Sequence, residues 1–399
     1  MDILDKLFDM TALGQLSGSP GTWIMIVVGL GLLYLGIVKE YEPLLLVPIA
    51  FGVILANSLG SGLGIVPSTP EIEHMTLLEI AKHHGILNFL YYALIKTGFL
   101  PPIIFMGVGA LTDFGPMLRN LRLAFFGAAA QIGIFTVVLA AVAMGFTLKE
   151  AASLGIIGGA DGPTAIYTTI MLAPHLLGPI AIAAYSYMAL VPVIIPLVAR
   201  LTMTKEEYLI NMKQQDKKYP SAKPIKNLRV AKILFPLVTG GIVAILVPSA
   251  VPLVGMLLFG NLIKEVGANT GRLKDAATGA IMNSATIFLG LTVGATMTAD
   301  TFLNMKTLGI IVGGFLAFAI SIAGGIFAVK AYNLFAKKKI NPLIGATGLS
   351  AVPMASRVAN DIALKHDPRN HILQYAMASN ISGVIGSAVA AGVLISFLS

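Results

Sequence analysis

Long apolar tracts separated by short polar segments make up most of this chain. Two apolar stretches, 151–173 and 341–355, are interrupted near their middle by turn-forming residues, GGADGP in the first and NPLIGATG in the second. Because Gly and Pro break continuous helices, we expect each to form a hairpin that enters the membrane and returns on the same side. Ten other tracts are apolar enough to cross a membrane as helices: 22–38, 43–58, 99–117, 123–145, 177–199, 233–248, 249–263, 277–298, 307–329 and 371–398.

The pattern therefore predicts an all-α polytopic membrane protein with about ten transmembrane helices and two re-entrant broken-helix hairpins. Composition agrees, since 56% of the 399 residues are hydrophobic and only 12% are charged. A soluble domain would carry about twice that charged fraction. The absence of cysteine excludes disulfides, thiolate metal sites and cysteine nucleophiles. The net charge of +8 does not indicate nucleic acid here, because in a membrane protein the placement of charge matters more than its sum.

The placement of lysine and arginine predicts the orientation. If the polar segment 201–232 is a cytoplasmic loop and the chain alternates from there, 22 of the 27 basic residues lie inside and 5 outside. This asymmetry follows the positive-inside rule and puts both termini outside. We expect membrane lipid around the helices and a multi-pass protein of a bacterial inner membrane.

Internal matches predict an inverted repeat. FMGVGALTDFGPML (105–118) is similar to FLGLTVGATMTADTFLN (288–304), GADGPTAI (159–166) to GATGLSAV (345–352), and the segment around Tyr185–Tyr187 to that around Ala378–Asn380. The three pairs occur in the same order but with opposite predicted topology. We therefore expect a first repeat in 1–200 with its hairpin near 151–173, and a second in 233–399 with its hairpin near 341–355. This is the architecture of ion-coupled transporters, whose sites lie near the midplane.

Asp161, at the tip of the first hairpin, is the strongest candidate for chemistry. A carboxylate at membrane depth costs about 2.5–3.5 kcal/mol, so it is usually retained for a task. The alternative is that Asp-Gly-Pro is ordinary turn chemistry at a solvated tip. The second hairpin offers neutral oxygens from Asn341, Thr347 and Ser350. One carboxylate with such oxygens would suit sodium, although these residues could equally satisfy helix ends.

Further candidates follow each hairpin. Tyr187 and Asn380 lie in the spans after the hairpins, where a tyrosine could also simply pack. Arg357 could bind an anionic carboxylate bidentately, and its alternative role is an orienting charge. His83 and His84 have no carboxylate or thiol at metal spacing, and no GxxxxGK loop is present.

The motifs GIIGGADGPTAIY (155–167) and NPLIGATGLSAVPMASRVAN (341–360) closely resemble the β subunit of the sodium-pumping biotin-dependent decarboxylases, from about residue 20 to the end. The resemblance implies decarboxylation of carboxybiotin coupled to outward sodium transport, with proton uptake. It implies catalytic roles for Asp161, Tyr187, Arg357 and Ser350, with Arg357 on the carboxylate of carboxybiotin. It implies sodium ligands at Asp161, Asn341, Gly345, Ser350 and Asn380.

The same resemblance implies a sodium ion as cargo and biotin supplied in trans. The expected partners are a carboxyltransferase subunit, a biotin-carrier subunit or domain, and a small membrane-anchor subunit. A homo-oligomer is compatible with the sequence, which does not identify the acyl substrate. The competing interpretation is a sodium- or proton-coupled secondary carrier for small carboxylates, since a broken-helix site at the midplane would serve either.

Overall fold

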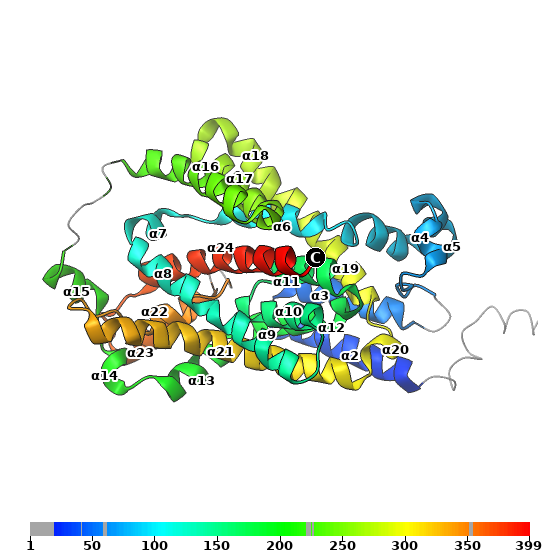
Figure 1. Ribbon diagram of the computed structural model, residues 1–399, viewed down its shortest axis with the longest axis horizontal. Coiled ribbons are helices and arrows are strands. Elements are labelled where there is room, and N and C mark those ends of the chain that lie inside the picture. The colour runs from blue at the N-terminus through cyan, green and yellow to red at the C-terminus, as the bar shows by residue number, and fades with distance from the viewer. Residues whose placement is uncertain (1–19, 41, 59–61, 221–224, 226, 351–353) are drawn as a thin grey trace, which may run out of the picture.

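The computed structural model is a helical bundle in which α2, α21 and α24 run along the long axis (Figure 1). It describes residues 20–40, 42–58, 62–220, 225, 227–350 and 354–399, and no strand occurs among them. The predicted all-α class is therefore confirmed for the described residues. The N-terminal stretch and residues 351–353 of the second predicted hairpin lie outside them.

Seven helices of the described residues are long and apolar enough to cross a membrane, or up to nine if each of two bent pairs is one span. The sequence pattern predicts about ten. The seven are α2 (Pro20–Ile37), α8 with α9 (Leu121–Ala130 and Ile132–Ala143), α16 (Leu228–Leu246), η5 with α17 (Pro248–Ala250 and Val251–Val266), the segment Ala268–Ala295 that ends in α19 (Met282–Ala295), α21 (Met305–Phe335) and α24 (Leu373–Leu398). The bent pairs are α5 with η2 (Leu77–Leu90 and Tyr91–Ile95) followed by α6 (Leu100–Leu111), and α12 (Leu177–Ala189) followed by α13 (Val191–Thr202).

Two predicted spans are wrong in detail. The tract 177–199 is not one straight helix, because the chain bends by 70° between α12 and α13. Pro192, in the first turn of α13, lacks the N–H that a continuous helix would need. The tract 99–117 ends as a helix at Leu111, and α7 (Gly115–Arg119) restarts it with Pro116 in its first turn.

The cytoplasmic loop predicted for 201–232 is partly folded onto the bundle. It contains α14 (Lys205–Tyr208) and α15 (Met212–Lys218), and the side chains of Tyr208, Asn211 and Met212 are buried. Asn341 and Asn370 both donate their side-chain amides to the carbonyls of Tyr208 and Ile210. Part of this loop therefore packs against the second hairpin rather than lying free in solvent.

Both predicted hairpins are broken helices. The first consists of α10 (Leu148–Gly155), the short η3 (Ile156–Gly159) and α11 (Gly162–Leu172). Ala160 ends η3 in the left-handed region at φ 54°, which reverses the chain before Asp161. The second consists of α22 (Leu343–Ala346) and α23 (Met354–His366), so it extends further than the predicted 341–355.

Helices from the two predicted halves pack against each other in pairs. In sequence order these pairs are α3 (Pro43–Ala56) with α19, α6 with α17, and α8 with α24. At each crossing a glycine lets the backbones approach: Gly52 faces the backbone of α19, Gly109 that of α17, and Gly127 that of α24. The site described below lies where α8, α24 and the two hairpins meet.

The ion pairs among the described residues agree with the predicted alternation of the spans. Each of the seven joins side chains that the charge pattern assigns to the same side of the membrane. Examples are Lys306 with Glu150 on the predicted outer side, and Lys338 with Asp216 on the predicted cytoplasmic side. The folding of the chain is thus consistent with one alternation of its spans.

Candidate functional site

Asp161 lies at the junction of the first hairpin, as the N-cap of α11. Its side chain accepts a hydrogen bond from the backbone N–H of Thr164 at 3.3 Å, and only 5% of the residue is exposed. The first turn of a helix has free N–H groups and a partial positive charge, both of which stabilise a carboxylate. The local sequence therefore holds a negative group in the middle of an apolar bundle.

Two serines bring other elements to the same carboxylate. Ser350, beyond α22 in the second hairpin, donates its hydroxyl to Oδ2 of Asp161 at 3.0 Å, and Ser387 of α24 donates to the same oxygen at 3.0 Å. The backbone N–H of Ser350 also donates to the carbonyl of Gly159 at 2.9 Å. The tips of both predicted hairpins and α24 therefore meet at Asp161.

Several buried oxygens in this region have no hydrogen-bond partner among the described residues. They include Oε1 of Gln131, the hydroxyl of Thr164 and Oδ1 of Asn380. A buried polar atom left unpaired costs about 1–3 kcal/mol, so such atoms call for an explanation. Oxygen-only ligands with a single carboxylate suit a hard cation of low charge. The donor set around Asp161 therefore fits an alkali cation.

Gln131 and Tyr185 lie next to the tip of the first hairpin. Gln131 sits between α8 and α9 and directs its amide N–H groups to the carbonyls of Gly127, Gly348 and Gly383, at 3.1, 3.2 and 3.4 Å. The ring of Tyr185 packs so closely on Gly162 that a Cβ there would overlap it. The Tyr185 hydroxyl is buried and has no partner among the described residues.

Asn380 supports the second hairpin from α24. Its side-chain amide donates to the carbonyls of Thr347 and Leu349, at 3.1 and 2.5 Å. These contacts fix the backbone directly before Ser350. Among the predicted sodium ligands, Asn380 is thus placed beside the Asp161 region, with Oδ1 free.

Asn341, Thr347 and Gly345 make other contacts. The Asn341 side chain donates to the carbonyls of Tyr208 and Ile210 and accepts from the N–H of Leu343. The hydroxyl of Thr347 donates to the carbonyl of Ala376 at 2.9 Å. Gly345 lies against the backbone of Gly325 in α21. No hydrogen bond joins Asp161 to any of these three among the described residues.

Tyr187 and Arg357 are also separate from the carboxylate. The Tyr187 hydroxyl donates to the carbonyl of Ile311 in α21, and its ring packs edge-on against Phe315 with the centroids 5.9 Å apart. Arg357, near the start of α23, is exposed and has no hydrogen bond or ion pair with a described residue. The guanidinium is thus available to a ligand at the second hairpin.

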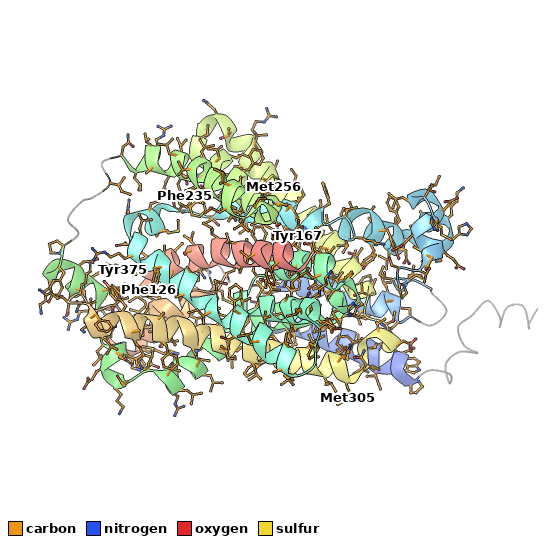
Figure 2. All side chains as sticks on the ribbon, in the orientation of Figure 1. Phe126, Tyr167, Phe235, Met256, Met305 and Tyr375 are labelled. Atoms are coloured by element: carbon orange, nitrogen blue, oxygen red, sulfur yellow. The ribbon has the colours of Figure 1, made fainter. Side chains whose placement is uncertain are left out.

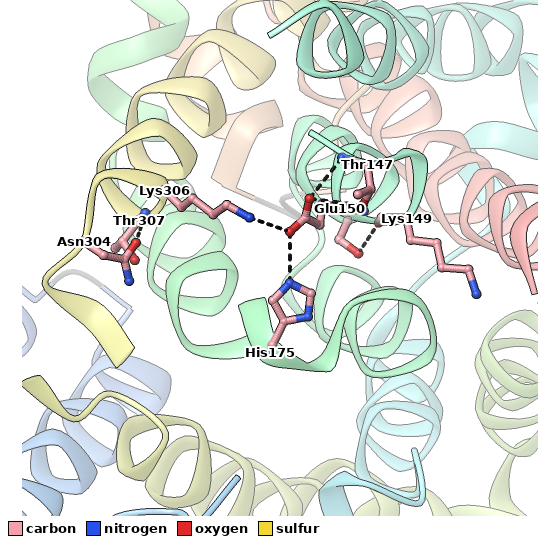
Figure 3. Close-up of polar contacts among 8 residues, drawn as sticks. Thr147, Lys149, Glu150, His175, Asn304, Lys306 and Thr307 are labelled. Carbon is pink, nitrogen blue, oxygen red and sulfur yellow. Dashed lines mark hydrogen bonds and ion pairs between the residues drawn. The ribbon is translucent and has the colours of Figure 1, made fainter. Parts of the chain in front are cut away.

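The base of the first hairpin is held by a charged cluster (Figure 3). Glu150 of α10 has only 7% of its side chain exposed, and it accepts from Nε2 of His175 at 3.0 Å and Nζ of Lys306 at 3.2 Å. It also accepts from the backbone N–H of Thr147 in a capping box. The pKa of Glu150 is lowered to about 2, chiefly by the Thr147 N–H and then by His175 and Lys306, against the effect of burial. This cluster ties α10 to α21 and to the turn after α11.

Sequence reasoning missed Ser387, Gln131 and Tyr185. Ser387 follows Asn380 by seven residues, which puts both on one face of α24, and this spacing was a usable signal. Gln131 is the one carboxamide in the predicted span 123–145. Tyr185 lies two residues before the predicted Tyr187, and only packing distinguishes them. No group of three or more His, Cys, Asp or Glu that could hold a metal occurs among the described residues.

Comparison with protein families gives one match over nearly the whole chain. Residues 21–398 match the family described as the Na⁺-transporting oxaloacetate decarboxylase beta subunit. The match contains both hairpins and every residue of the site described above.

Relatives with similar sequences cover 94% or more of the chain. A methylmalonyl-CoA decarboxylase subunit beta of Propionigenium modestum is 48% identical, over 94% of each chain. A probable oxaloacetate decarboxylase beta chain of Vibrio cholerae is 47% identical, over 95% of each chain. An oxaloacetate decarboxylase beta chain of Klebsiella pneumoniae is 44% identical, over 100% of this chain and 99% of its own. Relatives named for different acyl substrates are thus about equally similar.

Proposed function

This chain belongs to the family of Na⁺-transporting oxaloacetate decarboxylase beta subunits, and from that premise we propose that it decarboxylates carboxybiotin and drives sodium outward across a bacterial inner membrane. In this proposal a partner subunit presents the biotin, and a proton is taken up from outside in each cycle. The observation that carries the proposal is Asp161, a buried carboxylate that contacts the second hairpin through Ser350 and α24 through Ser387.

Sodium is the cargo, and we assign it to the oxygens around Asp161. Ser350 and Ser387 would turn their hydroxyl hydrogens away and offer lone pairs when the cation enters, and Oδ1 of Asn380 is already free. For Asn341 and Gly345 the support is the resemblance alone, because both are engaged elsewhere in this conformation. They would become ligands only after a movement of the second hairpin.

Release of the cation would be coupled to protonation of the same carboxylate. Sodium and a proton compete for Asp161, so either one neutralises the buried charge, and a charge left without compensation is costly in this environment. Because both hairpins contact the carboxylate, its occupancy would bias their relative position. Alternating occupancy would then move access from one face to the other, as expected for the proposed inverted repeats of 1–200 and 233–399.

The decarboxylation step needs an anchor for the carboxylate and a proton for the product. Arg357, exposed on α23, would bind the carboxylate of carboxybiotin with two N–H groups. As the N–C bond breaks, carbon dioxide leaves and the ureido nitrogen takes a proton. Tyr187 would supply this proton, with Ser350 and Asp161 completing the relay, after a movement that releases the Tyr187 hydroxyl from the carbonyl of Ile311. Water must be excluded until then, and the apolar surroundings of the hairpins favour this.

The chain would act within a complex. Its partners would be a carboxyltransferase subunit, a biotin-carrier subunit or domain, and a small membrane-anchor subunit. The acyl substrate would be read by the carboxyltransferase, which explains why relatives named for oxaloacetate and methylmalonyl-CoA are equally similar to this chain.

The test is release of carbon dioxide from a carboxylated biotin carrier by the purified chain, with and without sodium. We expect release that requires sodium and that is lost in Asp161→Asn, a variant that keeps the volume of the side chain. Arg357→Lys should weaken the affinity for carboxybiotin while leaving the sodium dependence unchanged. If the folded wild-type chain released no carbon dioxide under either condition, the competing function of a carboxylate carrier would replace this one.

A further inference from the structure

A cavity of about 560 Å³ is lined in part by Tyr375, which Figure 2 labels. It lies at the end of the molecule where α7, α8 and α15 gather (Figure 1). The charge pattern predicts that this end is cytoplasmic. The walls come from the α7–α8 junction, from α15, from the end of α21 and from the start of α24. None of the residues proposed for sodium or carboxybiotin lines it.

Among the residues that the structure describes, four cations and one carboxylate line this cavity. Arg119 and Arg122 come from the α7–α8 junction, and Lys337 and Lys338 follow α21. The carboxylate, Asp216, is already engaged, since it accepts from Nζ of Lys338 and from the hydroxyl of Tyr375, each at 2.5 Å. The cavity therefore keeps an excess of positive charge.

No contact within the described part of the chain accounts for the two arginines. Neither guanidinium has a hydrogen bond or ion pair with any described residue. Arg122 lies in the first turn of α8, where the helix dipole disfavours a cation. Orientation alone would be served by a lysine or arginine anywhere on this face, outside a cavity.

Exposed apolar side chains lie next to these cations. On α8, Leu121 and Phe125 are one turn apart and 62% and 69% exposed. At the end of α21, Leu334 and Phe335 are 78% and 91% exposed. A ligand that bound the cations with an anionic group could thus lay hydrocarbon along both helices.

We propose that this cavity is a binding site for the head group of an anionic phospholipid. The phosphate would take the Arg119 and Arg122 guanidinium groups, and Lys337 would add a third cation. The acyl chains would follow Leu121 and Phe125 along α8. Basic pockets between membrane helices on the cytoplasmic side are suited to such head groups. A protein partner with an acidic surface would use the cations but not the apolar flank.

The bound lipid would join elements from both halves of the chain. Arg119 ends α7 and Arg122 lies in the first turn of α8, which packs on α24, the helix that carries Asn380 and Ser387. Lys337 and Lys338 follow α21, and Lys338 is linked through Asp216 to Tyr375 at the start of α24. The lipid therefore lies at one end of the helix whose middle contacts Asp161.

The test titrates the purified full-length chain with phosphatidylglycerol or phosphatidylcholine and counts bound lipids by native mass spectrometry. A basic residue near an anionic head group strengthens binding by roughly fivefold. Arg119→Gln with Arg122→Gln removes two, and should weaken phosphatidylglycerol binding by roughly thirtyfold. Arg229→Gln with Arg272→Gln is the matched control, because both arginines are exposed on the same predicted side and outside the cavity. It should change the binding less than about twofold.

Three results would overturn the proposal. Equal losses of phosphatidylglycerol binding in the two double variants would show that the arginines act only through the general positive potential of this surface. Displacement of the lipid by excess inorganic phosphate would show a site for free phosphate instead. Unchanged lipid binding, with loss of binding to a purified biotin-carrier protein, would make the cavity a docking surface for protein. Arg119→Lys with Arg122→Lys is the charge-conserving control. It should bind more lipid than the glutamine pair, which would show that the loss in the glutamine pair comes from charge and not from misfolding.

Discussion

At the scale of single residues, the hydrogen bonds of Asp161 determine what the site can hold. Both serine hydroxyls donate to the same oxygen, Oδ2, while Oδ1 accepts the longer contact from the backbone N–H of Thr164. A cation that displaced the two hydroxyl hydrogens would gain three oxygens at once. Removing one hydroxyl should therefore act on sodium affinity more than on the fold.

Ser387→Ala should raise the sodium concentration needed for half-maximal turnover by roughly tenfold, because the variant lacks one of the oxygens proposed to coordinate sodium. Ser382→Ala is the matched control on the same helix, since its hydroxyl donates to the carbonyl of Ala124 and does not touch Asp161. The measurement is sodium-dependent decarboxylation by the assembled complex, together with the sodium-dependent shift in melting temperature of the chain. Equal effects of the two substitutions would contradict the assignment of Ser387.

At the same scale, the sequence revealed Asp161 and Ser350 but not Ser387 or Gln131. Asp161 and Ser350 stand in turn-forming motifs, where a polar residue interrupts an apolar tract. Ser387 is one of several serines in an otherwise apolar helix, and only the packing of α24 on the hairpins selects it. Asn341 also stands in such a motif, but its side-chain amide donates to the carbonyls of Tyr208 in α14 and Ile210 after it. Its position in the motif did not predict these contacts.

At the scale of elements, the first hairpin depends on close packing at its turn. The ring of Tyr185 occupies the space that a Cβ on Gly162 would need. Gly162→Ala should therefore destabilise the protein by about 1–3 kcal/mol through overpacking. Gly241→Ala in α16 is the control, because nothing lies within 4 Å of the added methyl group and alanine favours the helix. Thermal unfolding in detergent should lower the melting temperature for Gly162→Ala alone.

The base of the same hairpin should respond to acid through Glu150. Its pKa in the folded protein, about 2, is lower than the ordinary value of 4.5. The stabilisation from this cluster is therefore fully present above about pH 4.5 and is lost as the pH falls towards 2. Glu150→Gln should lower the melting temperature at neutral pH, because the donors of Lys306 and His175 lose a charged acceptor.

The same variant should flatten the acid dependence of the melting temperature between pH 4.5 and 2. Glu71→Gln, at an exposed position of α4 (Pro70–His74), is the matched control and should leave the curve of the wild-type chain unchanged. If Glu150→Gln showed the same acid dependence of the melting temperature as the wild-type chain, other groups would be responsible for it.

Hydropathy predicted most of the elements, and its errors have a common cause. A window of apolar residues reports that a segment is in the membrane, but it does not report its direction. The bend between α12 and α13 and the break after α6 are invisible to it, although Pro192 and Pro116 stand at both restarts. The length of the second hairpin was underestimated because α23 is amphipathic rather than apolar.

At the scale of the whole molecule, the predicted orientation rests on charge alone, because the ion pairs of the described residues would be the same in either direction of insertion. The absence of cysteine makes this directly testable, since any label must report an introduced residue. Lys82→Cys in α5 and Lys217→Cys in α15 are exposed positions on the predicted outer and cytoplasmic sides.

A maleimide that cannot cross membranes should label Lys82→Cys in intact cells and leave Lys217→Cys unlabelled, because only an outer thiol is within its reach. Both variants should react after permeabilisation, which shows that each thiol is accessible in the folded chain. The reverse pattern would invert the molecule in the membrane. Glu150 and His175 would then face the cytoplasm, and the cationic cavity beside Arg119 would face outside, away from the leaflet whose charge attracts basic residues. The direction of proton entry and the lipid site therefore depend on this one result.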